Sequence, residues 1–445
     1  MNPSRPWSRR RFLQASAVAG GLAALSACGS SEETAKLAAG TVANPRGVSL
    51  KILVNQPHRT AFTTVLADAW AKETGGSIEV TAAPYDQLTS KQILDVQGGS
   101  GEFDVFDYFY FGLGALVDAG ALVDLTDWIN GDPDLDTADF LPSIYDPYTL
   151  YNDRRYGLPY DGDLHILFYN KEIFDRHQLN PPSTWDEYDE AARKITTDAK
   201  GAYYGAIVSG QQVPMILGCS FINRLAGFGG TLLDATGKPA LTSDAAIAAA
   251  QHLVDVSPAA LPTPLQVGFD QANTAFLSGQ GAMLDTWTDM SLRAGDASMS
   301  KIIGKWGVVS LPVGGANTTP RTALDAGFGL GVSTASKHRA EAAAFVKFAA
   351  SKAQNLRQVS TAGSGIDPNR KSVLHSADYA KATPVAAEVI RQNLDGSPLV
   401  WPKTPSAPKI LQTLVDELAL AVQGKQPAKA ALERTQQAWE QELAK

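Results

Sequence analysis

Strand and helix patterns alternate between residues 49 and 106, and this alternation constrains the fold more than any other feature of the sequence. Strand patterns occur at 49–54, 77–82 and 103–106, and helix patterns at 61–74 and 87–96. Such a rhythm predicts right-handed crossovers and a parallel sheet. Because ligands of these sheets bind beyond the carboxyl ends of the strands, the segments 55–58, 84–85 and 107–110 are candidate site loops.

A second α/β block begins near residue 156, and a chain of 445 residues has the length of two or three domains. Later strands are predicted at 164–169, 282–286, 306–311 and 327–333, and helices at 185–197, 242–256, 268–278, 337–358, 405–423 and 427–442. A short helix begins at 170–172, and the segment 181–185 caps the helix after it. These patterns predict an α/β fold class.

The N-terminal residues predict export and lipidation. Residues 8–13 resemble a twin-arginine signal. The apolar stretch that follows, 15–27, has the length of a signal peptide and is too short to span a bilayer. Residues 25–28 (Leu-Ser-Ala-Cys) match the bacterial lipoprotein tetrapeptide. We therefore predict a signal peptide over residues 1–27 and a lipid on Cys28, which anchors the exported protein to the outer side of the cell membrane. The alternative is an ordinary secretory signal with a chance cysteine.

Residues 28–47 are small, polar and unpatterned, which predicts a lipidated flexible tether before the fold begins. Loss of the leader removes four arginines and no acid, which lowers the formal charge from −8 to −12. A protein this acidic is a poor nucleic-acid binder. Only Cys28 and Cys219 are present, so lipidation of Cys28 excludes a disulfide, and Cys219 is predicted to be a small buried apolar residue.

Catalytic and cofactor motifs are missing from the sequence. It contains no G-x-S-x-G, no dinucleotide fingerprint and no phosphate-binding G-x-x-x-x-G-K, and its six histidines are never four residues apart. We therefore expect no cofactor and no metal. Asp161 and Asp163 could form a glycosidase pair, since two carboxylates at this spacing are compatible with that chemistry. In the alternative interpretation, one of them binds substrate hydroxyls and the other is solvated.

Aromatic residues recur at the predicted loops and strand ends. They are Tyr85, Tyr108, Tyr110, Tyr160, Phe221, Trp287, Phe328 and Trp401. A flat ring can cover the apolar face of a sugar, while nearby carboxylates and amides bond to its hydroxyls. Each ring could equally belong to the core. Their recurrence where an α/β cleft would form favours a sugar-like ligand.

Several series of residues resemble signatures of the extracellular solute-binding proteins of sugar-uptake ABC importers, the family 1 group to which the maltose-binding protein belongs. The series are 156–161, 167–171, 182–187, 276–283 with Trp287, 340–348 and 424–439. Together they run in order from about residue 48 to the C-terminus. The chain is therefore identified as a member of this family.

The resemblance implies a two-lobe periplasmic-binding-protein-like fold with a hinge and an interlobe ligand cleft. By analogy, the N-terminal lobe comprises 48–160 and 327–362, and the C-terminal lobe comprises 161–326 and 363–445. Ligand would close the lobes, and the closed form would engage permease subunits in the membrane. No catalysis is expected of such a protein.

The resemblance, together with the aromatic and acidic residues noted above, implies ligand-binding residues. From the loops and series above these are Gln56, His58, Tyr85, Tyr108, Tyr110, Asp161, Asp163, Phe221, Asn223, Trp287, Phe328, Asp367, Arg370 and Trp401. His58 stands where the maltose-binding relative has a lysine, so maltose itself is not implied.

The function predicted is capture of a sugar, oligosaccharide or polyol for an ABC permease, with no nucleic-acid partner. The alternatives are an exported sugar-active enzyme and a surface carbohydrate sensor or adhesion module.

Overall fold

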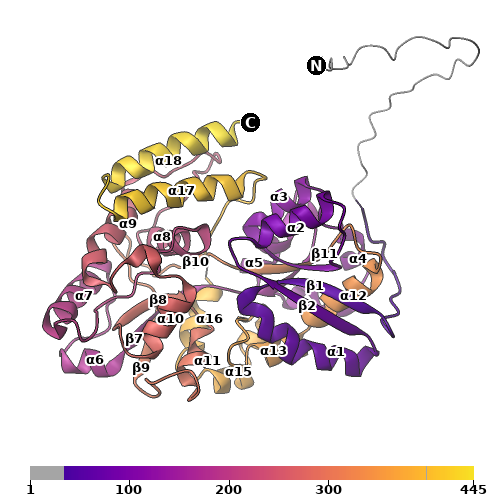
Figure 1. Cartoon of the computed structure of the whole chain (residues 1–445), viewed down its shortest axis with the longest axis horizontal. Helices are drawn as coiled ribbons and strands as arrows, with labels where there is room; N and C mark the ends of the chain where they lie inside the picture. Colours follow the sequence, from indigo (N-terminus) through magenta and orange to yellow (C-terminus); the bar gives the residue numbers. More distant parts are fainter. Residues whose placement is uncertain (1–34, 397) are drawn as a thin grey trace, which may run out of the picture. The chain divides into compact units, whose positions relative to one another are not determined.

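Two separate β-sheets organise the computed structural model, which describes residues 35–396 and 398–445 (Figure 1). The predicted signal peptide over residues 1–27, the predicted lipid on Cys28 and the first part of the tether lie outside the described residues. Within them, no helix is both long and apolar enough to cross a membrane. We call the parts built around the five-stranded and the three-stranded sheet the first and the second lobe.

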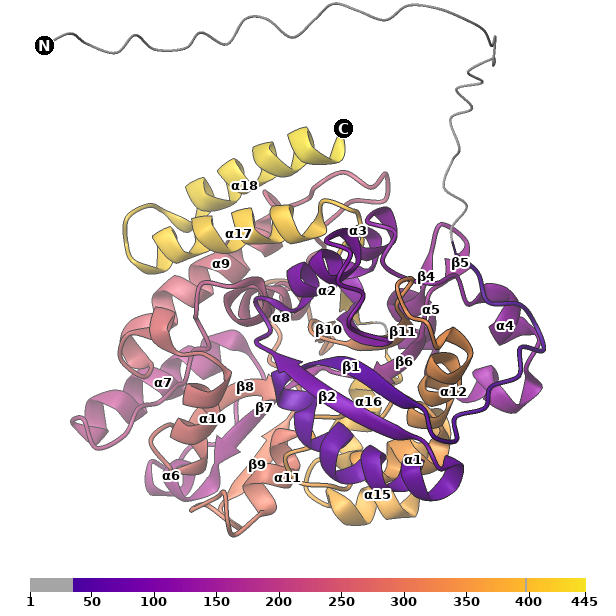
Figure 2. The same cartoon turned by 45° about the vertical axis from the view of Figure 1, so that its right-hand side comes forward.

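The first sheet confirms the alternation of strands and helices. Its strand order is β2-β1-β3-β11-β6, with β1 Ser49–Asn55, β2 Ser77–Ala83, β3 Val105–Phe109, β6 Leu158–Asp161 and β11 Phe328–Val332. Strands β1, β2 and β3 are parallel, as predicted, and β11 pairs antiparallel with both β3 and β6. The helices that connect the parallel strands lie on opposite faces of the sheet (Figures 1 and 2).

Helices of the first lobe surround this sheet. A π-helix at Ala61–Leu66 continues into α1 Ala67–Thr74. The other helices are α2 Leu88–Gln97, α3 Leu113–Asp118, α4 Thr126–Asn130, α5 Pro142–Thr149, α12 Arg339–Ala349 and α13 Lys352–Gln358. A small hairpin joins β4 Leu150–Tyr151 to β5 Arg154–Arg155. The single helix predicted at 337–358 is wrong, because the chain breaks at Ser351. The Ser351 side chain accepts a hydrogen bond from the backbone N–H of Gln354 and so caps a new helix.

The second sheet has the antiparallel order β8-β7-β9. Its strands are β7 His165–Asn170, β8 Met283–Trp287 and β9 Trp306–Val309, and the helices around it are α6 Lys171–Arg176, α7 Trp185–Ala199, α8 Cys219–Gly227, α9 Asp244–Val256, α10 Phe269–Leu277 and α11 Met290–Gly295. The predicted cap of α7 is confirmed: Thr184 and Glu187 form a reciprocal capping box. Cys219 is fully buried, as predicted.

The C-terminal part of the chain adds short elements and two long helices. The elements are β10 Ala323–Leu324, α14 Lys371–Leu374, α15 Ala377–Ala382, α16 Ala387–Leu394, β12 Leu399–Val400, α17 Ala407–Val422 and α18 Ala428–Leu443. Helices α17 and α18 pack on each other and on α9 of the second lobe (Figure 2). Trp439 is buried between them and donates its indole N–H to the carbonyl of Ile410.

Residues 35–47, which the sequence places in a flexible tether, instead contact the first lobe. The Leu37 N–H donates to the carbonyl of Asp124, and the Asp124 N–H donates to the carbonyl of Ala35. The Leu37 side chain is 8% exposed and belongs to the core. One apolar side chain in a polar stretch carries no periodic signal, which is why the sequence pattern missed this contact.

The chain crosses between the two sheets more than once, and the crossing segments contact each other. The chain leaves the first sheet after Asp161 and enters the second at His165, then returns between Leu324 and Phe328. A later segment lies against the first crossing, because Asn369 donates its side-chain N–H to the carbonyl of Tyr160 at 2.6 Å. The lobe boundaries beyond these crossings, including the last return near Gly363, stay a prediction.

Gly162 lies in the first crossing, and a Cβ at this position would overlap the carbonyl oxygen of Pro368. We therefore expect Gly162→Ala to push the two segments apart and to lower the free energy of unfolding by about 1–3 kcal/mol. Gly295 is the matched control, because a Cβ there meets no atom within 4 Å. Gly295→Ala should change the free energy by less than about 0.5 kcal/mol. Equal denaturant midpoints for the two variants would contradict this packing.

Candidate functional site

A pocket lies between the two sheets, and both lobes contribute to its lining. Its residues are Asn55, Pro57, His58, Tyr85, Phe109, Asp163, Met215, Ile216, Phe269, Trp287, Asp289, Ala326, Phe328 and Gly365. We call it the interlobe pocket. Its empty space is about 410 Å³, and this volume includes the part that opens to solvent.

The ends of strands deliver several of these side chains. Asn55 ends β1, Phe109 ends β3, and Trp287 ends β8. The pocket therefore adjoins the carboxyl ends of the parallel strands, where the sequence pattern places a ligand site.

His58 is held between two buried carboxylates. Its Nδ1 lies 2.8 Å from an oxygen of Asp107, and its Nε2 lies 3.3 Å from an oxygen of Asp161. Burial opposes protonation of the ring, but the charges of both aspartates and the hydrogen bonds to them outweigh it and raise the pKa of His58 to about 10. The ring is a cation at neutral pH and packs edge-on against Phe328, with 4.3 Å between centroids.

Trp287 is fixed by two neighbours behind the pocket. Its indole N–H donates to a carboxylate oxygen of Asp325 at 3.2 Å, and the His165 ring stands perpendicular to it at 4.5 Å. Phe269 lies 5.3 Å away on the pocket side. The ring is 7% exposed, so only a small part of it is open to the space of the pocket.

An ionic network supports Trp287 from within the second lobe. Arg224 donates two hydrogen bonds of 3.1 Å to Asp285, and the two ring nitrogens of His165 face Asp285 and Asp325. Burial opposes ionisation of Asp285, yet Arg224 and His165 lower its pKa to about 2. Burial raises the pKa of Asp325, although Asn223 donates to it at 2.5 Å.

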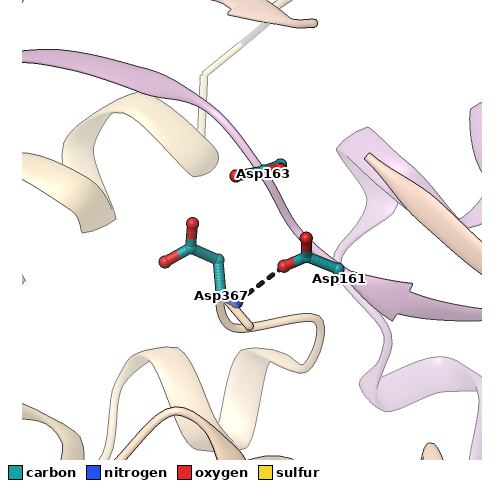
Figure 3. A group of neighbouring side chains, drawn as sticks. All are labelled: Asp161, Asp163 and Asp367. Atoms are coloured by element: carbon teal, nitrogen blue, oxygen red, sulfur yellow. Dashed lines mark hydrogen bonds between the residues drawn. The ribbon is translucent and has the colours of Figure 1, made fainter. Parts of the chain in front are cut away.

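Three aspartates converge beside the pocket (Figure 3). One carboxylate oxygen from each of Asp161, Asp163 and Asp367 lies within 4.8 Å of the others, and all three residues are buried. The backbone N–H of Asp367 donates to Asp161 at 2.6 Å. Burial raises the pKa of all three carboxyl groups, and the repulsion between them raises those of Asp163 and Asp367 further. The group could bind hydroxyls, an organic cation or a metal ion.

Half of the predicted ligand-binding residues lie in or directly behind the pocket. His58, Tyr85, Asp163, Trp287 and Phe328 line it, and Asp161 and Asp367 adjoin it through the carboxylate cluster. The Tyr85 hydroxyl donates to the side chain of Gln211, which fixes the ring at the rim.

Tyr108 and Tyr110 lie in the core instead of the pocket, because β3 continues to Phe109 and is not replaced by a loop after Phe106. Their hydroxyls donate to the carbonyls of Tyr148 and Leu324. Side chains alternate along a strand, so Phe109 faces the pocket where Tyr108 does not.

The remaining predicted residues lie away from the pocket lining. Asn223 and Trp401 bond to the side chain and the backbone carbonyl of Asp325, so they support Trp287 indirectly. Phe221 is fully buried in α8. Arg370 donates to backbone carbonyls of the first lobe, including that of Ala350, and Gln56 is exposed.

Sequence reasoning did not single out the other lining residues. Asn55 and Phe109 lie within the candidate loops, and Asp289 lies two residues after Trp287, so proximity was an available signal. Phe269 and Met215 carry no chemical signal that separates them from the core.

Comparison with known proteins decides the family. Residues 56–356 match the family of bacterial extracellular solute-binding proteins. The chain belongs to this family. The resemblance found in the sequence is thereby confirmed, and its relatives are binding proteins of transport systems.

Relatives of this solute-binding protein cover most of its length. A probable amino-acid ABC transporter periplasmic-binding protein of Sinorhizobium fredii is 26% identical over 370 residues, 81% of each chain. A solute-binding protein of Agrobacterium radiobacter K84, solved in complex with ribitol, is 26% identical with a TM-score of 0.79, over 89% of this chain and 99% of that one. The maltose-bound MalE3 of T. maritima has the same TM-score at 22% identity, over 88% of this chain and 99% of that one. At this identity the similarity supports a shared fold and nothing more. The predicted two-lobe fold is confirmed.

Proposed function

We propose that this solute-binding protein captures a carbohydrate or polyol in the interlobe pocket and delivers it to an ABC permease. The observation that carries the proposal is the placement of Trp287 and Asp163 in one pocket. A flat ring covers the C–H face of a sugar or the carbon chain of a polyol, and a carboxylate accepts its hydroxyls. The ribitol bound by the Agrobacterium relative is a ligand of this class.

The pocket favours binding over hydrolysis. A glycosidase needs two carboxyl groups that reach the scissile bond. Only Asp163 of the suggested pair lines the pocket, whereas Asp161 is fully buried, accepts from the Asp367 N–H and faces His58. Asp161 therefore has no free approach to a ligand.

Both lobes supply lining residues, so a ligand between them would favour a closed arrangement over an open one. Binding energy that exists only when both lobes touch the ligand shifts the population toward closure. The closed form is then the state that a permease can recognise.

We expect a thermal-shift screen of carbohydrates and polyols to find a stabilising ligand, since a ligand at 100 times its dissociation constant adds about 2.7 kcal/mol of stability. In calorimetry with that ligand, Trp287→Ala should weaken binding by about 2–4 kcal/mol through lost contact area. Asp163→Asn should weaken it by about 1–3 kcal/mol, because an amide replaces the carboxyl group that bonds to the ligand hydroxyls. Trp287→Phe keeps an aromatic ring in place and should therefore weaken binding less than Trp287→Ala does.

The melting temperature without ligand is the control for these variants. Near-native affinity of both Trp287→Ala and Asp163→Asn would place the ligand elsewhere. A collapse of the ligand-free melting temperature in Trp287→Ala would instead make the ring a core residue.

We also propose that the exported protein is held on the outer side of the membrane by a lipid on Cys28. The support is the Leu-Ser-Ala-Cys sequence at 25–28 behind an arginine-containing leader. Two acyl chains hold a protein on a bilayer where one gives only marginal binding.

Cys28→Ala should release the protein from the membrane fraction when it is expressed in a bacterial host with the lipoprotein pathway. Cys219→Ala is the matched control, because this second cysteine is buried in α8, and it should stay with the membranes. Equal membrane association of Cys28→Ala and the wild type would refute the anchor.

A further inference from the structure

Most buried acids around the interlobe pocket lie beside a basic side chain of the protein. Asp107 and Asp161 share His58, and Asp285 pairs with Arg224. Two further pairs complete the set: Asp325 faces His165 at 3.1 Å, and Asp289 is bound by Arg293 at 2.7 Å. Each of these acids therefore has a basic side chain of the protein beside it.

Asp163 and Asp367 are the exceptions. In the part of the chain that the structure describes, neither forms an ion pair with a lysine, an arginine or a histidine. Asp367 is 3% exposed, and its Oδ2 has no hydrogen-bond partner although the side chain points into the cluster with Asp163 (Figure 3). The polar side chains that reach these two carboxyl groups are other acids and Thr288. None of them is a cation, so the pair needs either a proton or a cation from outside.

The surroundings of Asp163 suit an organic cation. Aromatic rings line the same pocket, namely Tyr85, Phe109, Phe269, Trp287 and Phe328. The face of an aromatic ring attracts an ammonium group, because the electron-rich face of the ring interacts favourably with a cation. No lysine or arginine is found among the lining residues of the described chain, so the only cationic side chain at the pocket is that of His58, which is already shared by two aspartates.

A divalent metal ion fits the cluster less well. Calcium takes six to eight oxygen ligands. One oxygen of Asp161 accepts the N–H of Asp367, and the other faces His58 Nε2 at 3.3 Å. Both oxygens of Asp161 are therefore already engaged within the protein, and the protonated His58 ring beside them repels a metal ion.

We propose that the ligand carries a protonated amine as well as hydroxyl groups, so that it is an amino sugar or an amino polyol whose ammonium binds Asp163, with Asp367 behind it. This inference rests on the proposed capture of carbohydrates or polyols and narrows that class. The ammonium supplies the charge that the chain leaves unmatched, the rings cover the carbon skeleton, and the remaining polar groups bond to the hydroxyls.

Binding of an amine would also change the protonation of the site. Burial and mutual repulsion raise the pKa of both carboxyl groups, which favours their neutral forms in the free protein. Arrival of an ammonium stabilises the carboxylate, so a proton leaves as the ligand binds. A neutral sugar gives no such release.

The test compares matched pairs that differ only in an amine: D-glucamine with D-glucitol, D-glucosamine with D-glucose, and D-galactosamine with D-galactose. Titration calorimetry at pH 6, in buffers of different ionisation enthalpy, measures affinity and proton release together. We expect at least one amine to bind tenfold or more tightly than its neutral partner, with release of about one proton.

Variants test whether Asp163 causes the preference for an amine over its neutral partner. Asp163→Asn should bring the affinity ratio of amine to neutral ligand close to one, while the ligand-free melting temperature stays at or above that of the wild type, because a buried acid is removed. Asp132→Asn is the control: Asp132 pairs with Lys347 and does not line the pocket, so the preference should persist.

Other outcomes overturn the inference in distinguishable ways. Equal or tighter binding of the neutral members, without proton release, would refute the ammonium and leave carbohydrate capture intact. Stabilisation by calcium chloride alone that is lost in Asp163→Asn would make the cluster a metal site instead. Failure of every compound in the three pairs and in the wider carbohydrate screen would refute the proposed function along with the inference.

Discussion

Burial of several aspartates where the chain crosses between the lobes is the constraint on which the rest of the structure depends. Each carboxylate removed from water needs a cation, a hydrogen bond or a proton. His58 satisfies two of them, and in doing so it joins Asp107 on β3 to Asp161 at the end of β6. The first sheet is thereby tied to the first crossing at the point where the pocket begins. Truncation of His58 would leave two buried charges without a partner.

The same requirement positions the Trp287 ring that lines the pocket from the second lobe. Asp325 lies in the return crossing and receives the indole N–H of Trp287, while His165 stands between Asp325 and Asp285. Trp287 is therefore oriented by a group that belongs to a segment between the lobes. Movement of that segment would carry the ring with it, which gives a physical link between the arrangement of the lobes and the shape of the pocket.

Much of the fold follows from local patterns in the sequence. The strand and helix periods between residues 49 and 106 predict the three parallel strands, and the capping box at Thr184 marks the start of α7. The end of β3 could not be predicted from its pattern, because four aromatic residues follow Asp107, from Tyr108 to Phe111, and give no signal of where the strand stops. Pairing of Phe109 with Phe328 extends the strand, and that contact joins residues far apart in sequence.

The lining of the interlobe pocket was predictable where chemistry and family pattern coincide, as at His58, Asp163 and Trp287. It was not predictable where generic apolar side chains complete the lining, as at Met215 and Phe269, because only packing brings them to the pocket. The pairing of the buried acids with basic side chains could not be predicted from the sequence either. The sequence displays many acids, but only the three-dimensional pairing reveals that Asp163 and Asp367 lack a cation within the described chain.

The central claim is that ligand is held between two lobes that close on it. Small-angle X-ray scattering of the mature protein, with and without a saturating ligand from the screen, tests it most directly. The account predicts a smaller radius of gyration in the bound state, because closure brings the lobes together around a ligand that both contact. An unchanged radius at saturation, with binding verified by calorimetry in the same buffer, would contradict capture by closure.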